Sequence, residues 1–140
     1  MGVEIHPVAD ERERRQFIAV LDTVFGVDID DDEMAAAALT FERDRSLAVR
    51  DGGRIVATAA IRSFGLTVPG PAALPCAGIS AVGVLPTHRR RGLLTALMAR
   101  QQDDIAARGE PLAALIASEY PIYGRFGYGP ATFLAETAVA

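Results

Sequence analysis

The segment from Val82 to Leu94, VGVLPTHRRRGLL, limits the architecture of this chain more than any other stretch. Apolar residues and a glycine run as far as Leu85, and Pro86 then interrupts the regular pairing of backbone groups. Three arginines and Gly92 follow, and an apolar pattern with helical spacing starts directly after the glycine. A strand that leads into a helix through a basic turn is typical of proteins in which helices cover a sheet, so we expect a chain of mixed α and β structure.

Elements of both kinds are predicted elsewhere from the period of the apolar residues and from the turn residues between them. Strands are expected at residues 3–7, 46–50, 54–68, 76–85, 112–117 and 132–140. Helices are expected after Asp10, at 33–41, at 92–108 and, as a short one, at 122–126, with a loop at 69–75. The length suits one domain, and its predicted fold class is α+β, a mixed sheet flanked by helices.

Local signals position the helices more closely. Asp10 lies three residues before Glu13, which is the spacing of a capping box. The acidic run 30–32 suits the positive end of the second helix dipole, although the same carboxylates would also suit a metal ion. In the helix 92–108 an apolar stripe is expected to face the core, and it consists of Leu94, Leu97, Met98 and Ile105.

Charge and cysteine usage narrow the functional classes. A net charge of −4 argues against binding to nucleic acid, which needs a basic face. Cys76 is the only cysteine, so no internal disulfide can form and a reducing, cytoplasmic compartment is expected. No apolar run reaches the ~20 residues of a membrane span, and no secretory signal is expected at the N-terminus. His6 and His88 lie too far apart in the sequence for a zinc motif, so no metal site is predicted.

A helix that begins near Gly92 gives the basic turn a chemical role. The first N–H groups of a helix have no partner within it, and its dipole adds about half a positive charge there. Such an end binds phosphate, and glycine allows a diphosphate to approach the backbone closely. Arg89, Arg90 and Arg91 surround this opening. From the spacing alone, a solvated run of charges before an ordinary helix remains the alternative.

Signatures of other phosphate or nucleophile sites do not occur in the sequence. It contains neither a P-loop motif nor a G-x-G-x-x-G turn after a strand. Nothing supports Cys76 and His88 as a thiol–imidazole pair, and Ser118 lacks the G-x-S-x-G surroundings of a serine nucleophile. His88 is therefore interpreted as a turn residue.

The run Arg89-Arg90-Arg91-Gly92-Leu93-Leu94 after a strand resembles the acyl-CoA motif of the GNAT superfamily of N-acetyltransferases, written Q/R-x-x-G-x-G/A. Arg89 and Gly92 match this motif, whereas Leu94 departs from its final small residue. Together with ALIASEYPIYGRFGYGPAT at 114–132, residues 81–98 resemble the N-terminal region of the Eis (enhanced intracellular survival) acetyltransferases. The resemblance implies a mostly antiparallel sheet with a strand splayed from its neighbour at the acyl-CoA site.

The resemblance also implies a set of site residues. Backbone groups of the splayed strand, at Val82, Gly83 and Val84, would pair with the pantetheine arm. Amides at the helix start would hold the pyrophosphate, and these belong to Arg90, Arg91, Gly92, Leu93, Leu94 and Thr95. Ser118 and Glu119 would border the thioester, and Tyr123 would protonate the leaving thiolate. Tyr128 is expected to be structural.

The activity implied is transfer of an acetyl group from acetyl-CoA, as cosubstrate, to a primary amine of a small molecule or a lysine. The amine would attack the thioester directly. The alternative is a non-catalytic module that binds acyl-CoA. Acidic groups at Glu110, Glu119 and 30–33 are expected to attract a cationic acceptor.

The resemblance further implies relatives that are longer than this chain. Eis-like proteins carry a second acetyltransferase-like region and a further domain, and their terminal carboxylate is thought to act as base. We therefore expect residues 1–140 to form a single domain that is a fragment or a short version of such a protein. Assembly into a homo-oligomer is also expected.

Overall fold

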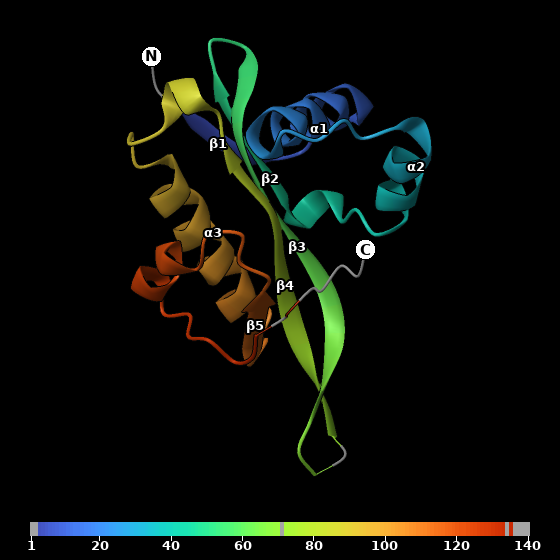
Figure 1. Cartoon of the computed structure of the whole chain (residues 1–140), viewed down its shortest axis with the longest axis vertical. Helices are drawn as coiled ribbons and strands as arrows, with labels where there is room; N and C mark the ends of the chain where they lie inside the picture. The colour runs from blue at the N-terminus through green and yellow to red at the C-terminus, as the bar shows by residue number, and fades with distance from the viewer. Residues whose placement is uncertain (1–2, 71, 134, 136–140) are drawn as a thin grey trace.

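One five-stranded sheet organises the chain, as the computed structural model, which describes residues 3–70, 72–133 and 135, shows (Figure 1). The strands follow one another in the order β1-β2-β3-β4-β5. Their bounds are Glu4–Pro7, Ser46–Asp51, Arg54–Val68, Ala72–Val84 and Leu112–Leu115. The first three pairings are antiparallel and β4 pairs with β5 in parallel. The predicted α+β fold with a mixed, mostly antiparallel sheet is confirmed.

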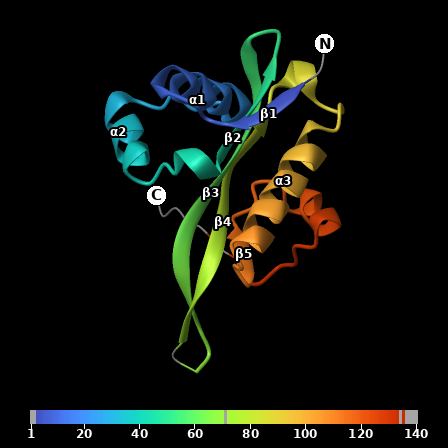
Figure 2. The same ribbon diagram turned by 180° about the vertical axis from the view of Figure 1, so that it is seen from behind.

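Helices cover both faces of this sheet (Figures 1 and 2). They are α1 (Glu11–Phe25), α2 (Asp31–Leu39) and α3 (Leu93–Ala107). Phe17 and Val20 of α1 pack with Ala48 and Ala60 on one face, whereas Leu93 and Leu97 of α3 pack with strand residues on the other. Among the described residues, no helix is long and apolar enough to span a bilayer.

The capping signals are realised in part. Asp10 caps α1 by accepting from the Glu13 amide at 2.8 Å. The Glu13 carboxylate, however, accepts from Ala9 N–H at 2.8 Å, whereas a capping box would have it accept from the N–H of the cap residue Asp10. The complete capping box belongs to α2, where Asp30 and Glu33 cap each other's backbone. The acidic run therefore lies at a helix start, which places α2 two residues earlier than expected.

The loop predicted at residues 69–75 is wrong, because Ala72–Pro75 form the first part of β4. The turn after β3 contains Pro69 and Gly70, and Pro75 lies opposite Gly65 in the β3–β4 ribbon. Pairing with β5 begins only at Cys76, so within the described residues the preceding part of β4 forms an edge on that side. A proline is tolerated there, since an edge strand need not donate on its free side.

The stripe predicted for α3 is also wrong in part. The buried residues are Leu93, Leu97, Met98 and Gln101, whereas Leu94 is half-buried. Gly92 is the N-cap residue rather than the first helical residue, and Leu93 turns toward the core in place of Leu94. Leu94 thus becomes available to a site at the helix start.

Smaller differences concern the last elements. β5 ends at Leu115, and the short helix predicted at 122–126 consists of two 3-10 turns, Tyr120–Ile122 and Gly124–Phe126. Thr132 and Phe133 lie in no strand, and most of the last strand predicted at 132–140 lies outside the described residues.

A bulge in the β3–β4 pairing and the early end of β5 together create a split in the sheet, between β4 and β5. The β3–β4 register shifts between Thr58 and Ala60, and Ala81 takes a left-handed conformation with φ of 52°. Thr58 Oγ1 holds this bulge by donating to Ala81 O at 2.9 Å. β5 ends opposite Ile79, while β4 continues to Val84. In the described part of the chain, residues 80–84 therefore have no strand partner on the β5 side.

Candidate functional site

A cleft of about 870 Å³ occupies this split and extends to the start of α3. It is lined by β4 from Gly78 to Val84, by the turn and first residues of α3, by the segment after β5, and by side chains of α1 and β3. Eleven of the predicted site residues meet here, namely Val82, Gly83, Val84, Arg90, Gly92, Leu93, Leu94, Thr95, Ser118, Glu119 and Tyr123. The chain thus brings together three segments that are far apart in sequence.

The start of α3 carries backbone N–H groups without a partner in the helix, and they belong to residues that line the cleft. The first helical hydrogen bond runs from Ala96 N–H to Gly92 O, so the amides of Leu93, Leu94 and Thr95 precede it. Gly92 has φ of 77°, and a Cβ built there would meet no atom within 4 Å. This backbone angle favours glycine, and the space beside it is open to a ligand. This geometry suits an anion at the helix end.

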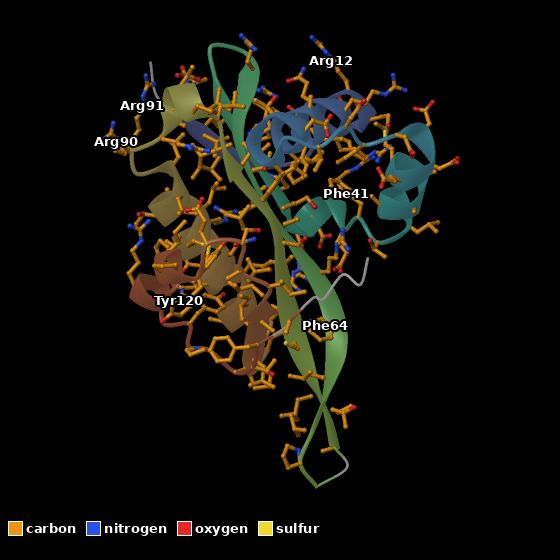
Figure 3. All side chains as sticks on the ribbon, in the orientation of Figure 1. Arg12, Phe41, Phe64, Arg90, Arg91 and Tyr120 are labelled. Carbon is orange, nitrogen blue, oxygen red and sulfur yellow. The ribbon has the colours of Figure 1, made fainter. Side chains whose placement is uncertain are left out.

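Arg91 lies outside the lining of the cleft. Its guanidinium is 3.7 Å from the Asp51 carboxylate, which also contacts His88 Nε2 at 3.2 Å. His88 Nδ1 lies 2.8 Å from Thr87 Oγ1, so both ring nitrogens are engaged. Figure 3 shows Arg90 and Arg91 beside the turn that leads into α3. Arg90, not Arg91, is the cleft arginine of the predicted pair.

Tyr123 lines the cleft and is half-buried. Burial, and then the nearby charge of Glu119, raise the pKa of its phenol above the ordinary value. A lowered pKa is therefore not the means by which this phenol would donate a proton. Tyr128 lies outside the lining and packs against the cluster of Ile61, Ala77 and Ile79. The two rings meet edge to face, with centroids 6.2 Å apart.

The acidic groups expected to attract the acceptor are mostly elsewhere. Glu110 binds the Arg45 guanidinium, with Oε2 2.6 Å from Nη2, and Asp30 and Glu33 cap α2. Among the residues that the structure describes, Glu119 is the only acidic residue that lines the cleft. Of the acidic groups predicted to attract an acceptor, Glu119 is therefore the one that lies in the cleft.

Sequence reasoning missed the wall that α1 and β3 contribute. Val24 and Phe25 come from the end of α1, and Arg62 and Phe64 come from β3. No local pattern distinguishes these residues, because their place depends on the register of β3 against β4. The alternation of β3 shows only that Arg62 and Phe64 share a face.

Comparisons with known proteins agree with the geometry. The family model described as an acetyltransferase (GNAT) domain matches residues 4–131. An uncharacterized N-acetyltransferase of Streptomyces avermitilis is 62% identical over 91 residues, 65% of this chain and 22% of that protein. The N-acetyltransferase Eis of Mycobacterium tuberculosis is 54% identical over 100 residues, 69% of this chain and 25% of its own length.

A solved structure shares the fold as well. The crystal structure of Eis1 from Mycobacterium abscessus has a TM-score of 0.81 and 40% identity, over 90% of this chain and 31% of that one. The chain thus spans about a quarter to a third of these Eis proteins. The motifs, the split sheet and the family match lead to one assignment: the chain belongs to the GNAT acetyltransferase domain family and is Eis-like.

Proposed function

We propose that this domain transfers an acetyl group from acetyl-CoA to a primary amine of a small molecule or a lysine. The observation that carries the proposal is the cleft, in which the unpaired edge of β4 meets the free amides of α3. The edge of β4 can pair with an extended, amide-containing arm of a ligand. The amides at the start of α3 can hold the phosphates of the same ligand.

The residues present fit acetyl-CoA. The backbone of Val82, Gly83 and Val84 would pair with the pantetheine amides, as an added strand does. The amides from Leu93 to Thr95 and the Arg90 side chain would hold the diphosphate. When bound, acetyl-CoA supplies an activated thioester, and the domain supplies position and charge stabilisation for the attack of a neutral amine.

Tyr123 would deliver the proton to the departing sulfur. A phenol with a raised pKa is a weaker acid than a thiol, whose pKa is near 8.5. Tyr123 therefore either transfers its proton as the carbon–sulfur bond breaks, or stays protonated and stabilises the departing thiolate by a hydrogen bond. Either role requires the hydroxyl group of Tyr123, whereas its ring only packs against its neighbours.

Release of free thiol separates this proposal from the alternative of a non-catalytic acyl-CoA-binding module. The protein is incubated with acetyl-CoA and a panel of primary amines, and free CoA is measured with a thiol reagent. We expect amine-dependent CoA release that requires the folded protein. Binding of acetyl-CoA without release for any amine would support the binding module instead.

Replacing Gly92 with valine is expected to weaken CoA binding at least tenfold, about 1.4 kcal/mol. The added side chain enters the open space beside the first α3 amides, where we place the diphosphate. Calorimetric titration with CoA measures the loss.

Gly109→Val is the matched control for Gly92→Val. Gly109 lies beyond the far end of α3, with φ of 66° and equally open space around its Cβ position. It imposes similar backbone strain away from the cleft, so CoA affinity should persist. Equal loss in both variants, or none in Gly92→Val, would remove the phosphate assignment.

The rate is expected to climb as the pH rises from 7 to 9.5. An aliphatic amine with a pKa near 10 is neutral in roughly one molecule per thousand at pH 7. The raised pKa of Tyr123 means that the phenol keeps its proton through this range, so loss of the acid adds no falling limb. Initial rates at saturating acetyl-CoA provide the profile. A bell centred near pH 7.5 would instead show that Glu119, His88 or a held water acts as base.

A further inference from the structure

Arg62 stands at the end of the cleft remote from the start of α3. It lies opposite Gly78 in the β3–β4 register, before the part of β4 that lacks a partner. From Gly78 to Val84 the strand covers about 20 Å at the usual rise per residue. Its neighbour Ile61 packs with Ala77 and Ile79 on the α3 side, so strand alternation places Arg62 on the face that α1 covers.

Two aromatic side chains belong to the cleft wall at different places, since Phe64 lies over Gly78 whereas Phe25 follows Val24, which lies close to Gly83. Phe25 is 47% exposed and Phe64 is 44% exposed, and both line the cleft. The Phe64 ring lies close over Gly78, because a Cβ on that glycine would meet the ring at 3.1 Å. Figure 3 shows Phe64 on β3, well separated from Arg90 and Arg91 at the other end. Half-exposed rings in a concave site suit the apolar body of a ligand.

The other arginines of the lining have different surroundings. Arg89 Nε donates to Val84 O at 3.4 Å, and the Arg125 guanidinium stacks over the Phe126 ring at 4.8 Å. Arg90 belongs to the turn before α3. Within the parts of the chain that the structure describes, the Arg62 side chain has no hydrogen bond or ion pair of its own. Arg62 is therefore the positively charged side chain that is available to a ligand at this end of the cleft.

The cleft therefore carries charges of opposite sign at different places. Glu119 lies near Tyr123, where it would attract an ammonium group. Arg62 lies at the Gly78 end of the cleft, where Phe64 also lies. A ligand that satisfies both charges has a cationic amine at one end and an anion at the other.

We propose that Arg62 selects acceptors that carry a carboxylate, so that the preferred acceptor is a primary amine with an aromatic or apolar body and a carboxylate remote from the amine. The amine end rests on the proposed function, whereas the carboxylate end rests on Arg62. A guanidinium offers its donors in a planar fork that matches a carboxylate in two parallel hydrogen bonds. Because Arg62 is exposed, the preference is expected to be about five- to twentyfold.

Three probes of one shape test the inference: 4-(aminomethyl)benzoate, its neutral analogue 4-(aminomethyl)benzamide, and benzylamine. Their affinities for the protein with CoA present are measured by ligand-observed NMR titration. Release of free thiol from acetyl-CoA is measured separately with the same probes. The variants are Arg62→Gln, Arg62→Lys and, as control, Arg12→Gln, which removes an exposed charge of α1 outside the cleft (Figure 3).

The expected result is that the benzoate binds at least fivefold tighter than the benzamide. Arg62→Gln should abolish this preference, Arg62→Lys should keep part of it, and Arg12→Gln should leave it unchanged. Equal affinity for both probes, a preference that survives Arg62→Gln, or no measurable binding of any probe would overturn the inference. Binding reports on Arg62 and thiol release on catalysis, so failure of the proposed function is seen separately as carboxylate-selective binding without CoA release.

Discussion

The Tyr123→Phe variant is expected to bind acetyl-CoA normally and to lose about 10²- to 10⁴-fold in kcat, the range for a missing general acid. Only one hydroxyl is removed, and the ring keeps its edge-to-face contact with Tyr128. The cleft therefore keeps its shape, and the loss reflects poorer proton supply to the leaving sulfur. Single-turnover rates of CoA release, measured beside calorimetric CoA affinity, separate this effect from a binding defect.

Tyr128→Phe is the matched control for that measurement. Both phenols are half-buried and both have a raised pKa, that of Tyr128 chiefly through burial. They differ in place, since Tyr123 lines the cleft and Tyr128 lies behind it against the core cluster. Near-normal turnover of Tyr123→Phe would exclude this phenol from the mechanism, and a large loss only in Tyr128→Phe would transfer the role to the other tyrosine.

Much of the fold could be predicted because its elements carry local signals. The strand at Arg54–Val68 has the bounds expected from its pattern, and Gly52 and Gly53 form the turn before it. The helix start at Gly92 also follows from neighbouring residues, since a glycine in a left-handed conformation can begin a helix directly after a turn.

What could not be predicted depends on pairing between distant segments. Residues Ala72–Pro75 look like a loop until β3 pairs with them. The left-handed Ala81 at the bulge has no local cause, because it follows from the register of Thr58 and Ala60. The cleft wall at Arg62 is non-local in the same sense, since its side chain reaches the cleft only through strand pairing.

The buried charge network around Arg45 is a further non-local feature, and it supports the split in the sheet. Arg45 is 2% exposed and precedes β2. Its Nη1 and Nη2 donate to both Glu110 oxygens at 2.8 and 2.6 Å, and its Nε donates to Asp104 at 2.9 Å. Glu110 lies just before β5, and Asp104 lies in the last turns of α3. One guanidinium thus ties the start of β2 to the segment that positions β5 beside β4.

Replacing Arg45 with methionine is expected to lower the free energy of unfolding by about 3–5 kcal/mol. The cost arises because the Glu110 carboxylate, whose side chain is 9% exposed, loses both of its charged donors. Urea unfolding followed by circular dichroism measures the change. Arg43→Met, the same substitution at an exposed position two residues away, should alter stability by no more than about 0.5 kcal/mol.

The double variant Arg45→Met/Glu110→Met decides whether the unpaired carboxylate is the cause. Removing both charges eliminates the desolvated Glu110, so the double variant should recover at least half of the stability lost in Arg45→Met. It remains informative even if the single variant does not fold, because recovery of a cooperative transition is then the readout. A double variant no more stable than Arg45→Met would place the effect in packing of the long arginine side chain. A loss below about 1 kcal/mol in Arg45→Met would show that β5 keeps its place without this tie.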